Sequence, residues 1–263
     1  MKVRRPAVAG TFYPSDADDL RRAIGTAFAD AVTAAPSSAS PKALIVPHAG
    51  YVYSGAIAAS AFGRVAATHD RIERVVLLGP SHRVHLLGMA VPSADSFETP
   101  LGAVPIDAEL RSRVLELPGV ALDDEPHRLE HSLEVELPFL QSVLGDFDLL
   151  PIAVGDATAD EVGTTLDAVW GGAETLIVIS TDLSHYHRYD EAVRLDCRTA
   201  SAIVAADHDA IGDRDACGSR PLRGLLQSAG RRGLDVEQLD VRNSGDTAGA
   251  RARVVGYGAF AVG

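Results

Sequence analysis

Three histidines each follow a short apolar run that is typical of a buried β-strand. The runs and their histidines are 43–46 with His48, 75–78 with His82, and 176–179 with His185. In an open α/β sheet, ligands bind just beyond the carboxyl ends of the strands, so side chains placed there can converge. Imidazoles combined with an anionic ligand and open coordination positions suit Fe(II), zinc or copper. The pattern therefore predicts a metal site, and the alternative is that each histidine caps a turn.

Two further side chains can contribute to such a site. Asp182 lies three residues before His185 and supplies a carboxylate. Cys217 lies in a polar, turn-prone segment, where a thiol is available as a ligand or a nucleophile, although a loop cysteine without such a role is the alternative. Cys197 falls on an apolar stripe of the helix expected over 190–206, which predicts a small buried side chain.

The segment 130–144 combines leucines at helical spacing with many polar groups. It predicts one helix that Pro138 kinks or shortens. His131 and Glu134 are three residues apart and would share one face of that helix, as part of a site or as a solvated face. The histidines that lie in polar segments are predicted at the surface: His69, His127, His187 and His208.

Apolar runs alternate with helical patterns along the chain and must position these residues. Helices are predicted near 20–31, from about 54, and near 107–117, 157–170, 190–206 and 221–231. Strands are predicted at 43–46, 75–78, 149–154, 176–179, 236–241 and 253–262. The proline at 151 indicates an edge or bulged strand, and 34–41 reads as a surface loop. The pattern predicts one α/β domain over 1–263, with a mixed, mostly parallel central sheet flanked by helices.

Composition excludes several classes of function. The chain has 263 residues, 46% of them hydrophobic, which is enough for a large core. Its formal net charge of -12 argues against nucleic acid or an anionic membrane as the main partner. We expect a cytoplasmic protein with two free thiols, because no apolar run approaches a membrane span and the N-terminus lacks a signal-peptide core. Walker, dinucleotide-binding, serine-hydrolase and Cys-x-x-Cys motifs are absent from the sequence.

Six ordered motifs resemble the Memo family, whose prokaryotic members are called AmmeMemoRadiSam system protein B. They are Gly10-Thr-Phe-Tyr-Pro14, Pro47-His-Ala-Gly-Tyr51 with Ser54-Gly55, Gly79-Pro-Ser-His82, Glu130-His-Ser-Leu-Glu134 with Leu137-Pro138, Ser180-Thr-Asp-Leu-Ser-His185, and Cys217-Gly218. The resemblance covers nearly the whole chain. The family's fold is similar to that of the LigB-type class III extradiol dioxygenases, non-heme Fe(II) enzymes that open catechol rings.

The resemblance implies roles for individual residues. His48 and His82 match the family's metal-binding histidines, and Cys217 takes the place of the dioxygenases' glutamate ligand. Asp182 and His185 match a pocket pair in which His185 is the acid–base group. The thiolate is the important departure, because a softer ligand shifts the metal preference toward Cu(I) or zinc.

Two functions follow as expectations. The first is a metal-dependent oxidoreductase for an unidentified small molecule, with Fe(II) preferred and copper or zinc as alternatives. In it Asp182 orients His185 as the acid–base group and His131 lies in the pocket. Tyr51 and Tyr53 are expected on the wall of that pocket, with a place in the core as the alternative for either. The second is a non-catalytic module that binds a metal or a peptide and acts with a radical-SAM protein partner.

Overall fold

A mixed β-sheet runs through the centre of the computed structural model, which describes residues 2–32 and 40–263 apart from the side chains of 67 and 68. Its strands are β2 (Ala43–Val46), β3 (Arg74–Pro80), β4 (Met89–Val91), β7 (Val120–Leu122), β8 (Asp148–Val154), β9 (Thr175–Ser180), β10 (His185–His187), β11 (Val236–Asn243) and β12 (Val254–Val262). The spatial order is β10-β12-β2-β9-β3-β8-β4-β7, and β11 pairs with β12. The predicted α/β fold with a mixed central sheet is therefore confirmed.

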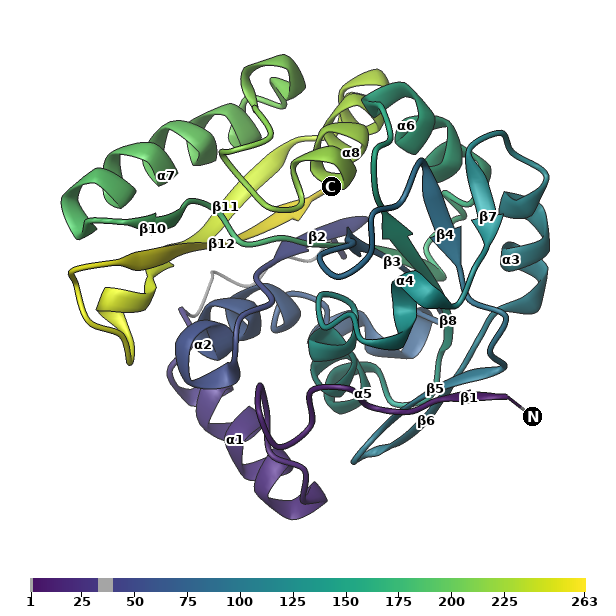
Figure 1. Ribbon diagram of the computed structural model, residues 1–263, viewed down its shortest axis with the longest axis horizontal. Coiled ribbons are helices and arrows are strands. Elements are labelled where there is room, and N and C mark those ends of the chain that lie inside the picture. The colour runs from purple at the N-terminus through teal and green to yellow at the C-terminus, as the bar shows by residue number, and fades with distance from the viewer. Residues whose placement is uncertain (1, 33–39) are drawn as a thin grey trace.

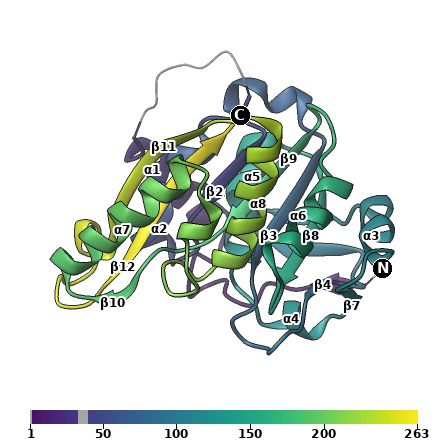
Figure 2. The same cartoon turned by 90° about the horizontal axis from the view of Figure 1, so that it is seen from above.

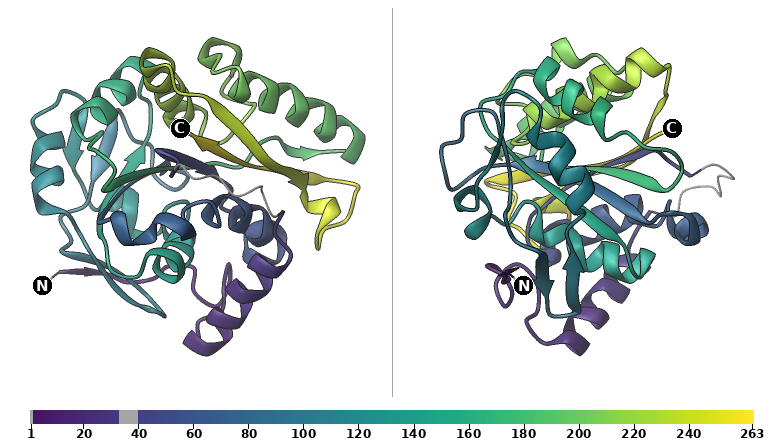
Figure 3. Two further views of the ribbon diagram at one scale, coloured as in Figure 1. Left: turned by 180° about the vertical axis from the view of Figure 1, so that it is seen from behind. Right: turned by 90° about the vertical axis from the view of Figure 1, so that its right-hand side faces the viewer.

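Helices cover both faces of this sheet (Figure 1). They are α1 (Ala17–Ala29), α2 (Tyr51–Phe62), α3 (Ala108–Leu115), α4 (Glu125–Arg128), α5 (Leu137–Leu144), α6 (Ala159–Ala168), α7 (Tyr189–Val204) and α8 (Ser219–Arg232). Figure 3 shows α1 and α2 on one side and α7 and α8 on the other, and Figure 2 shows α6, α7 and α8 lying across one face. Among the described residues, no helix has the length and apolar character needed to cross a membrane.

Side chains of the central strands alternate between two hydrophobic cores. On β9, Leu176 and Val178 pack in the core that contains α1, α2 and α5, whereas Ile177 and Ile179 pack in the core that contains α3, α6 and α8. Successive side chains of a strand point to opposite faces, so a strand covered on both faces is apolar throughout. This is why the predicted central strands appear in the sequence as continuous apolar runs.

The parallel centre of the sheet brings the predicted site residues to one edge. Strand β2 is parallel to β9 with Val46 opposite Ser180, and β9 is parallel to β3 with Ile179 opposite Leu78. The carboxyl ends of the three strands therefore lie together, and the segments that carry His48, His82 and Asp182 leave the sheet at that edge.

A small second sheet lies beside the main one. It contains β1 (Val3–Arg4), β5 (Ser96–Thr99) and β6 (Gly102–Pro105), with β1 parallel to β5 and β5 antiparallel to β6. Strands β5 and β6 form a hairpin within 92–105. The surface loop predicted at 34–41 falls mainly on residues 34–39, which lie outside the described residues.

The helix predicted over 130–144 is wrong in its first half. Helix α5 begins at Leu137, with Pro138 in its first turn, where the missing N–H would have had no helical partner. A short 3₁₀ turn, Glu134–Glu136, precedes it. His131 lies before both elements, so it does not share a helix face with Glu134.

Strand β8 lies between β3 and β4, so the predicted edge or bulged position is wrong. It pairs with β3 along its whole length, including Pro151 opposite Leu77. Proline is tolerated because β4 pairs with β8 only at Ala153 and Val154, and the ladder on that side does not reach Pro151.

Cys197 is exposed, which contradicts its predicted burial. The buried face of α7 runs through Ala192, Asp196 and Ile203 instead of through Cys197 and its neighbour Val193. This face was not recognised in the sequence because Asp196, which belongs to it, is charged. The Asp196 carboxylate lies inside because it accepts a 3.0 Å hydrogen bond from the Ser184 backbone N–H.

His127 is buried, so its predicted surface position is also wrong. Its side chain is 1% exposed, and its Nε2 lies 3.0 Å from the Ala90 carbonyl oxygen, to which it can donate. Burial lowers the pKa of His127 to about 4, and the hydrogen bond to Ala90 opposes that shift only in part. His69, in contrast, is exposed as predicted.

We expect His127 to make the protein sensitive to mild acid. Its pKa is about 4 when folded and about 6.5 when unfolded, so the unfolded chain binds more protons between these values. The contribution to stability is present above about pH 6.5 and is lost as the pH falls toward 4, by at most ~3 kcal/mol. Urea unfolding at about pH 7 and about pH 5 should show a smaller acid loss for His127→Gln than for wild type. Equal losses would contradict this assignment.

Candidate metal centre

His48 follows the carboxyl end of β2, and both its backbone and its side chain have hydrogen-bond partners. Its backbone N–H donates to Asp182 Oδ1 at 2.9 Å, and its Nδ1 lies 2.7 Å from Ser180 Oγ. The side chain is 1% exposed, and burial is the main cause that lowers the pKa of His48 well below the usual histidine value. The imidazole is therefore neutral at pH 7, which is the form that binds metals.

Glu130 supports two further imidazoles. Its Oε1 lies 2.9 Å from His82 Nδ1 and 3.2 Å from His131 Nδ1, and its Oε2 accepts the His82 backbone N–H at 2.6 Å. The two imidazole rings are stacked, with centroids 4.9 Å apart. Although burial alone would raise it, the nearby His131 and His82 imidazoles and the Ser132 backbone N–H hold the pKa of Glu130 well below its usual range. The carboxylate is therefore an ionised support beneath both rings.

The three imidazoles form a compact cluster. One ring nitrogen from each of His48, His82 and His131 lies within 4.8 Å of the others. The Nδ1 atoms of His48 and His82 already have hydrogen-bond partners, Ser180 Oγ and Glu130 Oε1, so their Nε2 atoms are left to face a ligand. His131 Nδ1 lies 3.2 Å from Glu130 Oε1 without a hydrogen bond. Oxygen partners on the far ring nitrogen are the usual support of metal-binding histidines. The donor set and its support therefore fit a metal ion.

Cys217 reaches the same cluster from the loop that precedes α8. Its Sγ lies 3.2 Å from His48 Nε2 and also accepts the Asp182 backbone N–H at 3.2 Å. Burial, together with the Asp182 carboxylate, raises the pKa of the Cys217 thiol. A metal cation among these groups would act in the opposite sense and favour the thiolate. The next residue, Gly218, allows this approach, because a Cβ there would come within 2.8 Å of the Ser180 carbonyl oxygen.

Asp182 and His185 lie in the same region but are not paired with each other. The Asp182 carboxylate accepts the His48 backbone N–H, whereas His185 Nδ1 lies 2.8 Å from the Leu183 carbonyl oxygen. The prediction that Asp182 orients His185 is therefore wrong. Burial raises the pKa of Asp182 to about 7, against the hydrogen bond from His48. Burial also lowers the pKa of His185, so this imidazole is neutral near pH 7 with Nε2 free to accept a proton.

The candidate ligands and the Asp182 and His185 side chains line one cavity of about 940 Å³. The predicted residues on its wall are His48, His82, His131, Asp182, His185 and Cys217. Its wall also includes residues for which no site role was predicted, namely Phe12, His187, Arg214, Arg253 and Tyr257. His187 was predicted at the surface, and the structure places it half-buried on this wall.

Tyr51 does not line this cavity, in contrast to the prediction. Its hydroxyl donates to the Val135 carbonyl oxygen at 2.7 Å, and its ring contacts Phe139 at a centroid distance of 4.8 Å. Tyr53, the other tyrosine expected on this wall, does line the cavity. Both residues lie in the first turn of α2, where a shift of two positions turns a side chain to another side of the helix.

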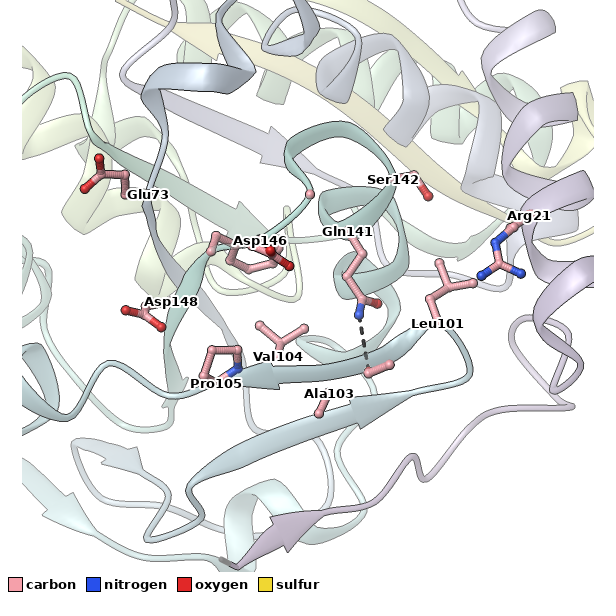
Figure 4. Close-up of a pocket in the computed structure, with 13 residues that line it drawn as sticks. Arg21, Glu73, Leu101, Ala103, Val104, Pro105, Gln141, Ser142, Asp146 and Asp148 are labelled. Carbon is pink, nitrogen blue, oxygen red and sulfur yellow. Dashed lines mark hydrogen bonds between the residues drawn. The ribbon is translucent and has the colours of Figure 1, made fainter.

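A second hollow, of about 750 Å³, lies elsewhere on the surface (Figure 4). Its wall carries Arg21, Glu73, Asp146 and Asp148, and Gln141 donates to the Gly102 carbonyl oxygen there. None of the predicted site residues lies on this wall. The candidate chemistry is therefore concentrated in the histidine-lined cavity.

Comparison with solved structures identifies a relative in fold. A crystal structure of an uncharacterized protein from Escherichia coli K12 matches with a TM-score of 0.53 and 17% sequence identity. The match covers 82% of this chain and 98% of that one. At this level of identity the similarity concerns the fold alone.

Comparison of sequences identifies the family. The family model described as Memo-like protein matches residues 4–261. A MEMO1 family protein of Aquifex aeolicus is 38% identical over 98% of both chains, and one of Aeropyrum pernix is 37% identical over 100% of both. The chain therefore belongs to the Memo family.

Proposed function

We propose that this protein is a metal-dependent oxidoreductase with one metal ion, Fe(II) in preference to copper or zinc, bound in the histidine-lined cavity. One observation carries the proposal: the imidazoles of His48, His82 and His131 and the Cys217 thiol converge, and an oxygen lies beside Nδ1 of each imidazole. Imidazoles whose far ring nitrogen lies beside a protein oxygen are typical metal ligands.

Two ligand sets share His48 and His82 and differ in the third member. We assign that position to Cys217, because its Sγ is in direct contact with His48 Nε2. His131 then lies beside the ligands, stacked on His82. A soft sulfur ligand in place of a carboxylate also allows copper or zinc to bind, and it changes the reduction potential of a bound iron ion.

The remaining residues have roles that do not depend on the identity of the metal. A bound Fe(II) would supply one-electron and dioxygen chemistry at the floor of the cavity. His185 accepts a proton at Nε2, since its Nδ1 is directed to the Leu183 carbonyl oxygen. Phe12, Tyr53 and Tyr257 give the wall apolar area that suits a small organic substrate and reduces the access of water.

Anaerobic purification followed by nitric oxide binding tests the proposal. We expect about one Fe(II) per chain and an electron paramagnetic resonance signal from its nitric oxide adduct, because three protein ligands leave open positions. The signal should change in Cys217→Ser if sulfur is a ligand. Stoichiometric metal that binds no nitric oxide would contradict a redox role, and it would favour the non-catalytic module with a radical-SAM protein partner.

A further inference from the structure

Ser180 Oγ lies at the centre of a small buried network behind His48. It is 2.7 Å from His48 Nδ1, 2.6 Å from the Ser132 carbonyl oxygen and 2.9 Å from Glu136 Oε1. Ser180 and Glu136 are at most 1% exposed, and Ser132 is fully buried. Each of the three contacts must therefore be satisfied by a proton that the protein itself supplies.

Counting protons leaves one consistent arrangement. A serine hydroxyl has one hydrogen to donate and two lone pairs to accept with, and a carbonyl oxygen can only accept. Ser180 must therefore donate to the Ser132 carbonyl, and the other two contacts must each bring their own hydrogen. In any other arrangement, two oxygens, or a nitrogen and an oxygen, are in contact with no hydrogen between them. In an interior without water such a contact destabilises the folded protein.

We propose that Glu136, as a neutral acid, and Ser180 are positioning residues that hold His48 with its proton on Nδ1 and its Nε2 lone pair directed at the metal. This inference rests on the proposed metal site, since Nε2 is the atom that faces Cys217. Glu136 does not touch the metal ligands and acts only through the Ser180 hydroxyl. Burial, with a smaller contribution from Asp182, holds the pKa of Glu136 well above its usual range, in agreement with the proton count.

The same hydroxyl also connects two parts of the metal centre. By donating to the Ser132 carbonyl, Ser180 ties the end of β9 to the segment that carries Glu130 and His131. The Ser132 hydroxyl in turn donates to the Pro80 carbonyl oxygen at 2.9 Å, next to the segment of His82. Ser180 therefore contributes to the relative placement of all three imidazoles.

The tautomer can be measured on metal-free protein by ¹⁵N–¹H correlation spectra of the histidine rings, with His48 assigned by comparison with His48→Gln. We expect His48 to carry its proton on Nδ1 in wild type and in Glu136→Gln, because a glutamine amide also donates to Ser180. In Ser180→Ala the Nδ1 partner is lost, and the Nε2–H form should appear. An Nε2–H tautomer in wild type would overturn the inference, whether or not the protein binds metal.

Metal titration provides the second measurement. We expect Ser180→Ala to weaken metal binding by about 10–100-fold, the usual effect of removing a support behind a ligating histidine. Glu136→Gln should keep an affinity close to that of wild type, and so should the control Ser201→Ala on the exposed face of α7. A loss in Glu136→Gln as large as that in Ser180→Ala would show that an ionised Glu136 is required, and would overturn the neutral-acid assignment.

Discussion

Replacing His48 and His82 together with alanine is expected to abolish stoichiometric metal binding. Both imidazoles present Nε2 to the same cluster, and both ligand sets that the geometry allows include them. Loss of two direct ligands should cost more than the ~10–100-fold that follows removal of a supporting hydrogen bond. Elemental analysis of protein purified without oxygen should give about one metal ion per chain in wild type and almost none in the double variant.

A matched double variant separates the loss of ligands from the loss of any two histidines. His69→Ala with His208→Ala removes two imidazoles that do not line the cavity, and this protein should keep its metal. Circular dichroism should show that both double variants are folded. The same sub-stoichiometric metal content in wild type and in the His48, His82 variant would refute the metal centre.

Glu134→Ala is expected to destabilise the protein by about 3–5 kcal/mol, because it leaves the buried Arg4 guanidinium without its counter-charge. The Glu134 carboxylate is fully buried and pairs with Arg4. It also accepts the backbone N–H groups of Ala7 and Val8 at 2.7 and 3.0 Å and the Tyr13 hydroxyl at 2.5 Å. The variant loses all four partners at once, so urea unfolding should show a greatly reduced unfolding free energy.

The surface pair of Glu125 and Arg128 offers the control for this prediction. Both side chains are more than half exposed, and their ion pair closes within one helical turn. Glu125→Ala should therefore change the unfolding free energy by less than about 1 kcal/mol. If Glu134→Ala has a similarly small effect on the unfolding free energy, the ion pair between Arg4 and Glu134 does not anchor the N-terminal segment.

The anchor also bears on the metal centre. Arg4 donates to the carbonyl oxygens of His127 and Glu130 as well as to Glu134, so it fixes the end of α4 and the segment that follows it. Glu130 in turn supports His82 and His131. Loss of the Arg4 anchor should therefore loosen the carboxylate that holds two of the three imidazoles.

The sheet and the edge at which the site lies could be predicted because they depend on local patterns. Strands β2, β3 and β9 are buried on both faces and appear as continuous apolar runs. Their parallel arrangement follows from the alternation with helices, and it places His48 and His82 together.

The supports of the imidazoles could not be predicted, because they come from distant parts of the chain. Glu130 contacts His82 across 48 positions and Ser180 contacts Glu136 across 44, and a sequence pattern carries no signal at such separations. His131 was placed on a helix because the leucine spacing in 130–144 conceals the start of α5 at Leu137. Glu130 did offer one signal, since it directly precedes a histidine in a segment rich in polar groups.

X-ray absorption spectroscopy at the edge of the bound metal can identify the ligand set, because it counts sulfur and imidazole ligands around one ion. We expect imidazole nitrogens at about 2.0–2.1 Å and one sulfur at about 2.3 Å, distances typical of such ligands on zinc and close to those for other divalent ions. The sulfur signal should disappear in Cys217→Ser and persist in His131→Ala. A metal with imidazole ligands but no sulfur in wild type would contradict the assignment of Cys217 and point to the three histidines as the ligand set.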